Sequence, residues 1–426
     1  MNIRLAYGKN GVDVSLPDDL RFDIVEPAYV TALPDQAGAI RRALRRPIGS
    51  APLRKLVGPS DTVGIVCNDI TRPTPYRVIL PALLAELSCV RDNSITLFIA
   101  TGTHRANTPD ELRAMLGEQV TDRFRIVQND ANDRESHGLV GTTKSGNEIW
   151  IHKEYLRCDV RILTGLIEPH FFAGFSGGGK ACMPGLALLE SVLKNHSAGN
   201  IDHPKATWGV THGNPVWEDI REAALMASPS FLLNVALNRE QRITAVFAGD
   251  MEQAHEYGCA FVGRHAMVPV SRHYDIVITS NSGYPLDLNL YQSVKGMSAA
   301  ARIIKDHGAI IIAADCCDGI PEHGEYKRLL SDASLLERIR SGACVVQDAW
   351  QAQIHAVICE RADVYLFSHN LTDEQIGLSM LKPCRDIART VGQLLRLYGH
   401  DASVCVLPDG PQTIPYVQIC KAGETP

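Results

Sequence analysis

The feature that most constrains the fold is the repeated alternation of short, uninterrupted apolar runs with longer stretches of helical periodicity. A run such as TVGIVCN, residues 62–68, is apolar along its length and bounded by polar residues, which is typical of a strand with both faces buried. Buried strands that are joined through helices are typical of parallel sheets. The sequence therefore predicts an α/β fold with mainly parallel sheets flanked by helices.

The alternation can be followed along most of the chain, apart from a polar, glycine-containing hairpin and loop at 129–151, and it breaks at residues 264–273. Before this interruption the predicted strands are 62–68, 94–100, 123–128, 159–166, 231–236 and 243–247, and the predicted helices are 76–87, one that opens at 108–111, and 251–262. After it the predicted strands are 274–279, 309–314 and 364–368, and the predicted helices are 290–304, 334–340, 350–361 and 384–397.

The chain length of 426 residues exceeds the size at which a single hydrophobic core stops growing. Together with the interruption near residue 270, this length predicts two domains. We expect an N-terminal α/β domain over 1–270 and a C-terminal, Rossmann-like α/β domain over 271–402.

Charge and hydropathy exclude several classes of partner. The 42 basic and 48 acidic residues give a net charge of −6 without a long basic run, which argues against a nucleic-acid or anionic-membrane partner. The apolar stretches are far shorter than the roughly 20 residues that span a bilayer, and the first residues lack the apolar core of a signal peptide. The 12 cysteines include no CxxC pair, so we interpret them as reduced, small hydrophobic residues of a cytoplasmic protein.

Polar and charged residues follow three of the predicted strands at the point where each strand ends. Asp69-Ile70-Thr71-Arg72-Pro73 follows the first strand, Thr101-Gly102-Thr103-His104-Arg105 the second, and Glu168-Pro169-His170 the strand at 159–166. Each residue alone has an ordinary interpretation, such as a helix cap for Asp69 or a solvated loop histidine for His104. Because ligands bind outside the carboxyl ends of strands in open α/β sheets, the three segments together predict a site.

A glycine-rich segment next to these residues ends in Lys180. The pattern Gly174-x4-Gly179-Lys180 matches a phosphate-binding loop except at Ala181, where a hydroxyl would be needed to bind magnesium. The segment could therefore be a simple turn, a triphosphate loop, or a bare backbone that lets a bulky ligand approach Lys180.

His196 lies sixteen residues beyond Lys180. On an unbroken helix the two residues would be about 24 Å apart. Pro184-Gly185 is expected to interrupt the path so that both can approach one ligand. His196 alone could instead be a cation at the end of a helix.

A further polar group lies in the C-terminal half, on the helix predicted at 290–304. Gln292 and Lys295 share one face of this helix, next to Tyr291, although a solvated polar face would give the same pattern. Trp350, at the start of a later helix, is by itself more typical of a core residue.

These segments together resemble the nickel-dependent lactate racemase family, whose members bind a nickel-pincer nucleotide. The resemblance covers both halves of the chain. It rests on Asp69 to Pro73, Thr101 to His104, Glu168 to Lys180, Asn195-His196, and Gly283 to Lys295.

The resemblance implies a role for each matched residue. Lys180 would hold the nucleotide covalently through a thioamide, His196 would be the protein's ligand to nickel, and His104 and His170 would be the two proton-transfer bases. The remaining roles are contact with the cofactor by Asp69, Ile70, Thr71 and Arg72, and binding of the substrate by Arg72, Tyr291, Gln292, Lys295 and, on a weaker match, Trp350. The family pattern also implies partner enzymes that assemble the cofactor, a site in the cleft between domains, and a C-terminal segment 403–426 that joins the first domain.

The implied reaction is chemically consistent with these residues. Removing the C2 hydrogen of a 2-hydroxy acid as a proton would leave a carbanion beside the carboxylate, whereas its removal as hydride gives a 2-keto acid and needs an electron sink. Inversion then needs one base on each face, and histidine titrates near neutral pH. We therefore expect a racemase or epimerase of lactate, a longer hydroxy acid or a sugar acid. The alternatives are an ATP- and magnesium-dependent phosphotransferase and a non-catalytic nickel- or nucleotide-binding protein.

Overall fold

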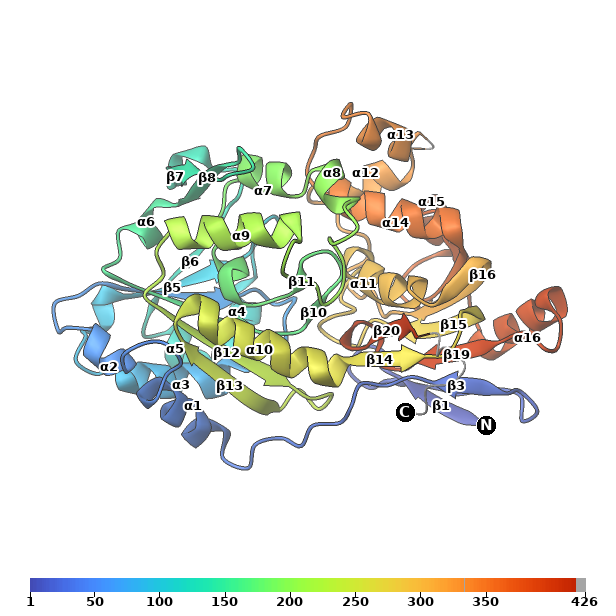
Figure 1. Ribbon diagram of the computed structural model, residues 1–426, viewed down its shortest axis with the longest axis horizontal. Helices are drawn as coiled ribbons and strands as arrows, with labels where there is room; N and C mark the ends of the chain where they lie inside the picture. Colours follow the sequence, from blue (N-terminus) through green and yellow to red (C-terminus); the bar gives the residue numbers. More distant parts are fainter. Residues whose placement is uncertain (333, 419–426) are drawn as a thin grey trace. The chain divides into compact units, whose positions relative to one another are not determined.

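The computed structural model describes residues 1–332 and 334–418. Contacts between residues divide the chain into two compact units, each built around its own sheet (Figure 1). The unit that we call the central unit consists of Tyr29–Glu168 and Phe172–Arg264. The other, which we call the terminal unit, consists of Met1–Ala28, Pro169–Phe171 and the described residues from His265 onward.

The central unit contains a six-stranded sheet in the order β13-β12-β9-β4-β5-β6. All neighbouring strands are parallel except β12 and β13, and an antiparallel hairpin, β7–β8, lies outside the sheet. The strands are β4 (Val63–Asn68), β5 (Ile95–Ala100), β6 (Arg125–Gln128), β7 (His137–Thr142), β8 (Glu148–His152), β9 (Val160–Leu166), β11 (Gly174–Phe175), β12 (Phe231–Leu237) and β13 (Ile243–Gly249). The helices are α1 (Gln36–Arg45), α2 (Leu53–Leu56), α3 (Tyr76–Glu86), α4 (Pro109–Leu116), α5 (Glu118–Thr121), α6 (Lys153–Leu156), α7 (Leu189–Asn195), α8 (Ala198–Ile201), α9 (Pro215–Met226) and α10 (Met251–Ala266).

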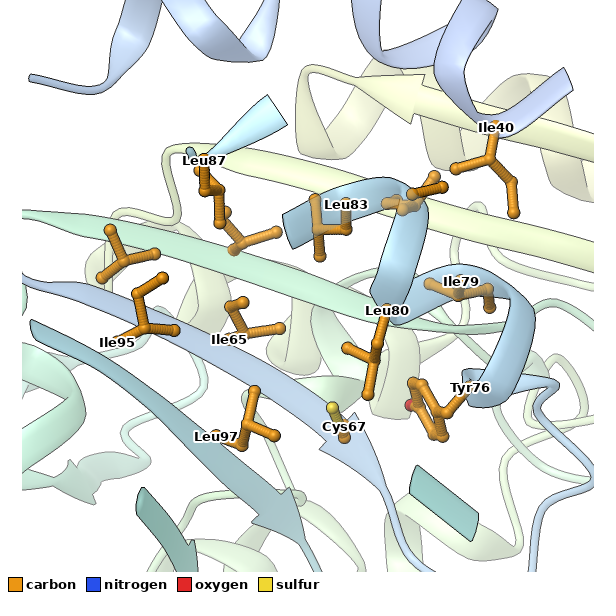
Figure 2. Packing of buried hydrophobic residues seen from close by; sticks show 14 of the residues in the cluster. Ile40, Ile65, Cys67, Tyr76, Ile79, Leu80, Leu83, Leu87, Ile95 and Leu97 are labelled. Atoms are coloured by element: carbon orange, nitrogen blue, oxygen red, sulfur yellow. The ribbon is translucent and has the colours of Figure 1, made fainter. Parts of the chain in front are cut away.

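The core of the central unit lies between its sheet and the helices that cover it. Figure 2 shows α3 packing its apolar side chains onto β4 and β5. The residues in this contact, all nearly inaccessible to solvent, are Ile65, Cys67, Tyr76, Ile79, Leu80, Leu83, Ile95 and Leu97. Burying a side chain of this size contributes about 1.5–3 kcal/mol, so the sheet and α3 form a firm base for the loops that follow β4 and β5.

The terminal unit contains a second six-stranded sheet, all parallel, in the order β18-β17-β16-β15-β19-β3. An antiparallel hairpin, β1–β2, and a parallel pair, β14–β20, accompany it. The strands are β1 (Asn2–Leu5), β2 (Val12–Ser15), β3 (Phe22–Ile24), β10 (Pro169–His170), β14 (Met267–Val270), β15 (Tyr274–Ser280), β16 (Ile304–Ala313), β17 (Asp363–Phe367), β18 (Lys382–Cys384), β19 (Val404–Leu407) and β20 (Ile414–Val417). The helices are α11 (Leu290–Ala301), α12 (Tyr326–Leu330), α13 (Leu335–Arg340), α14 (Ala349–Arg361), α15 (Asp373–Leu378) and α16 (Ile387–Tyr398).

The predicted fold class, an α/β protein with mainly parallel sheets flanked by helices, is confirmed. The two ends of the chain, however, differ from the expectation that 403–426 joins the first domain. β19 pairs with β15, and β3 pairs with β19, so the described residues of this segment, 403–418, lie in the terminal unit with residues 1–28. The apolar run of β19 predicts a buried strand but not which sheet it enters, because that choice depends on partners distant in sequence.

Two further observations concern membrane spans and cysteines within the described residues. None of the helices there combines the length and apolar character needed to cross a bilayer. The eleven cysteines that the structure describes are all free thiols.

Candidate active site

The loops after β4 and β5 bring Asp69 and His104 into contact. The two strands are parallel neighbours in which Asn68 pairs with Ala100, so the residues that follow leave the sheet side by side. The Nδ1 atom of His104 lies 2.6 Å from Oδ2 of Asp69, and the Thr71 hydroxyl donates a hydrogen bond of 2.7 Å to Oδ1. Asp69 is buried, whereas the His104 side chain keeps 24% of its surface exposed. The pair therefore has a fixed carboxyl and an imidazole that a ligand can reach.

The charge state of Asp69 follows from its surroundings. Burial raises the pKa of this carboxyl, but the charges of His104 and Arg72, with hydrogen bonds from His104 and Thr71, outweigh burial and hold the pKa below its ordinary value. A carboxylate accepts hydrogen bonds only, so it fixes the imidazole proton on Nδ1. In the neutral ring, Nε2 then carries the lone pair, which is the arrangement of a general base.

A third strand end contributes Glu168, which follows β9. Its Oε1 atom lies 3.3 Å from Nε of Arg72, and both side chains are about 85% buried, with 13% and 15% of their surfaces exposed. The Nη1 atom of Arg72 also donates a hydrogen bond of 2.9 Å to the Thr71 hydroxyl. The carboxyl ends of β4, β5 and β9 thus bring together Asp69, Arg72, His104 and Glu168.

The glycine-rich segment before Lys180 is packed tightly against the rest of the central unit. Gly177 and Gly178 have φ angles of +76° and +54°, and a Cβ atom would lie 2.7 Å from the Asn234 amide oxygen at Gly177 and 2.6 Å from the His255 ring at Gly178. The Gly178 amide also donates a hydrogen bond of 2.8 Å to Asn234. The protein's own side chains therefore require glycine at these two positions, whether or not a ligand binds to the segment.

The segment also differs from a phosphate-binding loop. In such a loop a helix begins at the lysine and directs its first amides at the phosphates. Here Lys180 lies in a short 3-10 turn, η3 (Gly178–Ala181), and within the described residues 174–195 the α-helix starts only at Leu189. The geometry gives no support to the triphosphate-loop alternative.

Lys180 and His196 lie against the same aromatic ring. The Nζ atom of Lys180 is 5.5 Å from the centroid of the Phe172 ring, and the His196 ring packs edge-on against it with centroids 5.0 Å apart. The chain turns back at Pro184-Gly185 between η3 and α7, and His196 ends α7 with its amide bonded to the Val192 carbonyl. The break expected at Pro184-Gly185 is therefore present, and it allows both side chains to reach Phe172.

Burial determines the charge of both side chains. Burial lowers the pKa of the Lys180 amine to about 7. The positive charge of Arg72 also lowers this pKa, whereas the negative charge of Glu168 raises it. Burial, with the nearby Lys180, also lowers the pKa of His196 to about 3. A neutral imidazole can donate a lone pair to a metal, and an amine that is partly uncharged near neutral pH can act as a nucleophile. The two residues therefore fit a group that is attached through an amine and carries a metal.

Apart from Arg72, the residues expected to bind substrate lie in the terminal unit, on α11 and α14. Gln292 and Lys295 are buried, with 2% and 6% of their surfaces exposed, and Lys295 donates a hydrogen bond of 2.7 Å to the Gln292 side chain. The solvated-face interpretation is therefore wrong for both. The indole N–H of Trp350 donates a hydrogen bond of 3.1 Å to the Tyr291 hydroxyl, so Trp350 also has a polar contact.

The last predicted residue, His170, lies in β10 and is grouped with the terminal unit. It is 5% exposed, and the centroid of its ring is 4.9 Å from that of Phe171.

The sequence analysis did not predict two of the contacts in the site. Glu168 is the partner of Arg72, and Asp69 is the partner of His104. The available signal was the presence of acidic and basic residues at the ends of neighbouring strands, but their pairing depends on strand order.

Comparison with known proteins finds relatives that match nearly the whole chain. Residues 7–209 match the family model of the lactate racemase N-terminal domain, and residues 270–414 match that of the lactate racemase C-terminal domain. The lactate racemase of Thermoanaerobacterium thermosaccharolyticum is 36% identical over 422 residues, covering 97% of this chain and 99% of that protein. The lactate racemase of Lactiplantibacillus plantarum is 36% identical over 425 residues, covering 96% and 98%.

Solved structures show the same similarity. The lactate racemase apoprotein from T. thermosaccharolyticum superposes with a TM-score of 0.88 at 36% identity and covers 97% of this chain and 100% of that one. A Thermotoga maritima crystal structure has a TM-score of 0.70 at 17% identity and covers 90% and 98%; at this identity the similarity concerns the fold alone.

Proposed function

This chain belongs to the lactate racemase family, and on that premise we propose that it interconverts the two enantiomers of a short 2-hydroxy acid, with lactate as the first candidate. The observation that carries the proposal is the placement of Lys180 and His196 against Phe172, with pKa values that favour an uncharged imidazole and a partly uncharged amine. A partly uncharged amine and an imidazole that could bind a metal, both against one ring, suit an attached metal cofactor better than a phosphate site.

We further propose that the attached group is a nickel-pincer nucleotide. Lys180 would hold it covalently, His196 would donate a ring nitrogen to nickel, and the segment from Asp69 to Arg72 would contact it. When bound, this group supplies an acceptor for the hydride that leaves C2 of the substrate.

The chain's own residues would then bind the substrate and move its hydroxyl proton. In this scheme Nε2 of His104 accepts the proton while the Asp69 carboxylate holds Nδ1, and His170 performs the same exchange for the opposite enantiomer. The cations proposed to bind the substrate carboxylate are Arg72 and Lys295. Arg72 is held at Nε by Glu168, and Lys295 donates a hydrogen bond to Gln292.

The test is to measure lactate racemisation by protein produced together with cofactor-assembly enzymes and nickel. Pure L-lactate and pure D-lactate are each expected to approach a racemic mixture, as followed by chiral chromatography. In His196→Ala, nickel content and racemisation should both fall to background while the group on Lys180 is retained. His203→Ala, an exposed histidine in the same segment, is the matched control. A nickel-loaded protein that leaves lactate and larger 2-hydroxy acids unchanged would refute the proposal.

Asp69→Asn tests whether the carboxylate orients His104. The asparagine has almost the same shape, but its amide group can donate to Nδ1 and so favour the tautomer with the proton on Nε2. We expect kcat to fall by roughly 10²–10⁴-fold, the contribution of one positioned base, with a much smaller change in KM. The measurement is steady-state kinetics with each enantiomer.

Asp92→Asn provides the control for this prediction, because Asp92 forms an exposed ion pair with Arg123 at the opposite ends of the strands. It should leave both constants at their parental values. If Asp69→Asn also retained the parental kcat, Asp69 would not be orienting a base.

A further inference from the structure

One buried carboxylate, that of Asp287, bonds the loop between β15 and α11 to two other segments of the terminal unit. Its Oδ2 atom accepts hydrogen bonds from two backbone amides, that of Gly8 at 2.7 Å and that of Asp315 at 3.1 Å. Its own carbonyl accepts a hydrogen bond of 2.9 Å from the Cys316 amide, and its own amide donates to the Gly283 carbonyl at 3.0 Å. One fully buried residue therefore joins three segments: the β1–β2 turn, the loop before α11 and the loop after β16.

The β1–β2 turn is itself a firm anchor. The hydroxyl of Tyr7 accepts a hydrogen bond of 3.0 Å from the His369 amide and lies 3.1 Å from Nδ1 of the same residue, at the end of β17. The carbonyl of Gly8 accepts a hydrogen bond of 2.8 Å from the Tyr284 amide. Gly283 has a φ angle of +69°, and a Cβ atom there would lie 2.8 Å from the Gly8 carbonyl oxygen. The first residues of the chain thus bind a loop distant in sequence, with Gly8 and Asp287 lying 279 positions apart.

This loop leads directly into the first turn of α11. Asn289, two residues after Asp287, is the N-cap of the helix. Its side-chain oxygen accepts a hydrogen bond of 3.1 Å from the Gln292 amide. Gln292 and Lys295 follow on the first two turns, bonded to each other. The Leu290 amide also bonds to the Gly319 carbonyl at 3.1 Å, so the hydrogen bonds of Asp287 are one of the constraints on the first turn from which both side chains project.

Burying the Asp287 carboxyl group lowers the stability of the fold. Its Oδ1 atom is buried and has no hydrogen-bond partner among the described residues. Burial raises the pKa of Asp287, and the nearby Asp315 carboxylate raises it as well. A buried oxygen without a partner destabilises the fold, so the residue is better explained by what its other oxygen holds in place.

We propose that Asp287 is a positioning residue of the substrate site, which fastens the loop before α11 to the N-terminal hairpin and thereby places Gln292 and Lys295. The inference rests on the proposed function, since it takes these two side chains to bind the substrate carboxylate. It assigns a functional part to the first residues of the chain, because the Gly8 amide donates a hydrogen bond to Asp287.

The experiment compares Asp287→Ala with Asp287→Asn in the cofactor-loaded enzyme. Alanine removes both accepted hydrogen bonds, and we expect KM for lactate to rise about 10-fold or more, with a smaller change in kcat. Asparagine keeps an acceptor oxygen and should restore most of the affinity, with thermal stability at or above that of the parent. Asp13→Ala, on the same hairpin but in an exposed ion pair with Arg4, is the matched control and should leave KM unchanged.

Hydrogen exchange followed by mass spectrometry gives a readout that does not depend on activity. In Asp287→Ala, peptides that contain Gly8 and Tyr284 to Gln292 should exchange faster, whereas those around Lys180 should not change. If Asp287→Ala does not fold, Tyr7→Phe takes its place, because it removes only the hydroxyl that binds the β1–β2 turn to His369. KM and the exchange of the same peptides should then rise, but by less than in Asp287→Ala.

The proposal is overturned if the alanine variant, or Tyr7→Phe in its place, shows parental KM and parental exchange, or if the asparagine variant is as impaired as alanine. Failure of the proposed function looks different. In that case the parent protein would racemise no 2-hydroxy acid, while the local exchange response to Asp287→Ala would still be observed.

Discussion

Lys180→Arg, produced together with the cofactor-assembly enzymes and nickel, is expected to carry no nucleotide and to racemise lactate no faster than a blank. Arginine keeps the positive charge and the length of the side chain, but its guanidinium stays protonated and is not a nucleophile. Lys180 itself has a pKa of about 7, so a large part of its amine is uncharged at neutral pH and able to form the bond. Mass spectrometry of the peptide that contains residue 180 measures the attachment directly.

Lys194→Arg is the matched control for this prediction. Lys194 is an exposed lysine on α7, two residues before His196, and its replacement should leave both the attached group and racemisation at parental levels. A parent protein that racemises lactate with an unmodified Lys180 would show that attachment at this residue is not required, and so would a Lys180→Arg protein that retains the nucleotide.

His104→Ala and His170→Ala are each expected to lower net racemisation by roughly 10²–10⁴-fold, the contribution of one positioned base. Each full turnover uses both bases, one to accept the hydroxyl proton and the other to return it. Hydride removal from one enantiomer, however, needs only the base on that enantiomer's side. Each variant should therefore retain the half-reaction with one enantiomer, and the two variants should retain opposite ones.

The measurement uses each pure enantiomer of lactate with deuterium at C2. Single-turnover mixing follows the absorbance of the cofactor and the release of the keto acid, with His203→Ala as the control for loss of a histidine. The two-base scheme is wrong if both variants lose the same enantiomer, or if either one continues to racemise lactate at the parental rate.

The parts of the fold that could be predicted are those encoded locally. The apolar runs at 62–68 and 159–166 became β4 and β9 within one residue at each end, and the segment 108–111 became the capped start of α4, with Thr108 and Glu111 in a capping box. Each signal lies within a few consecutive residues, and the parallel pairing follows once both faces of a strand are apolar.

The pairings between distant segments could not be predicted. Nothing in the four residues of β19 indicates that they lie between β15 and β3. The sequence indicates Lys180 and His196 as candidate site residues, but their shared contact with Phe172 depends on the turn at Pro184-Gly185. The reason for glycine at 177 and 178 could not be predicted either, because the side chains that crowd these positions come from the distant Asn234 and His255.

The pairing of β3 with β19 has a consequence for biosynthesis. A ribosome makes β3 among the first 24 residues, but β19, which separates it from β15, appears only at residues 404–407. Every sheet strand of the central unit has been translated by Gly249, so that unit can fold while the rest of the polypeptide is still being made. Until β19 has been made, the backbone groups at one edge of β15 are unpaired and can pair with a strand of another chain. A product truncated before Val404 never closes this edge, and we expect it to aggregate or to be held by chaperones.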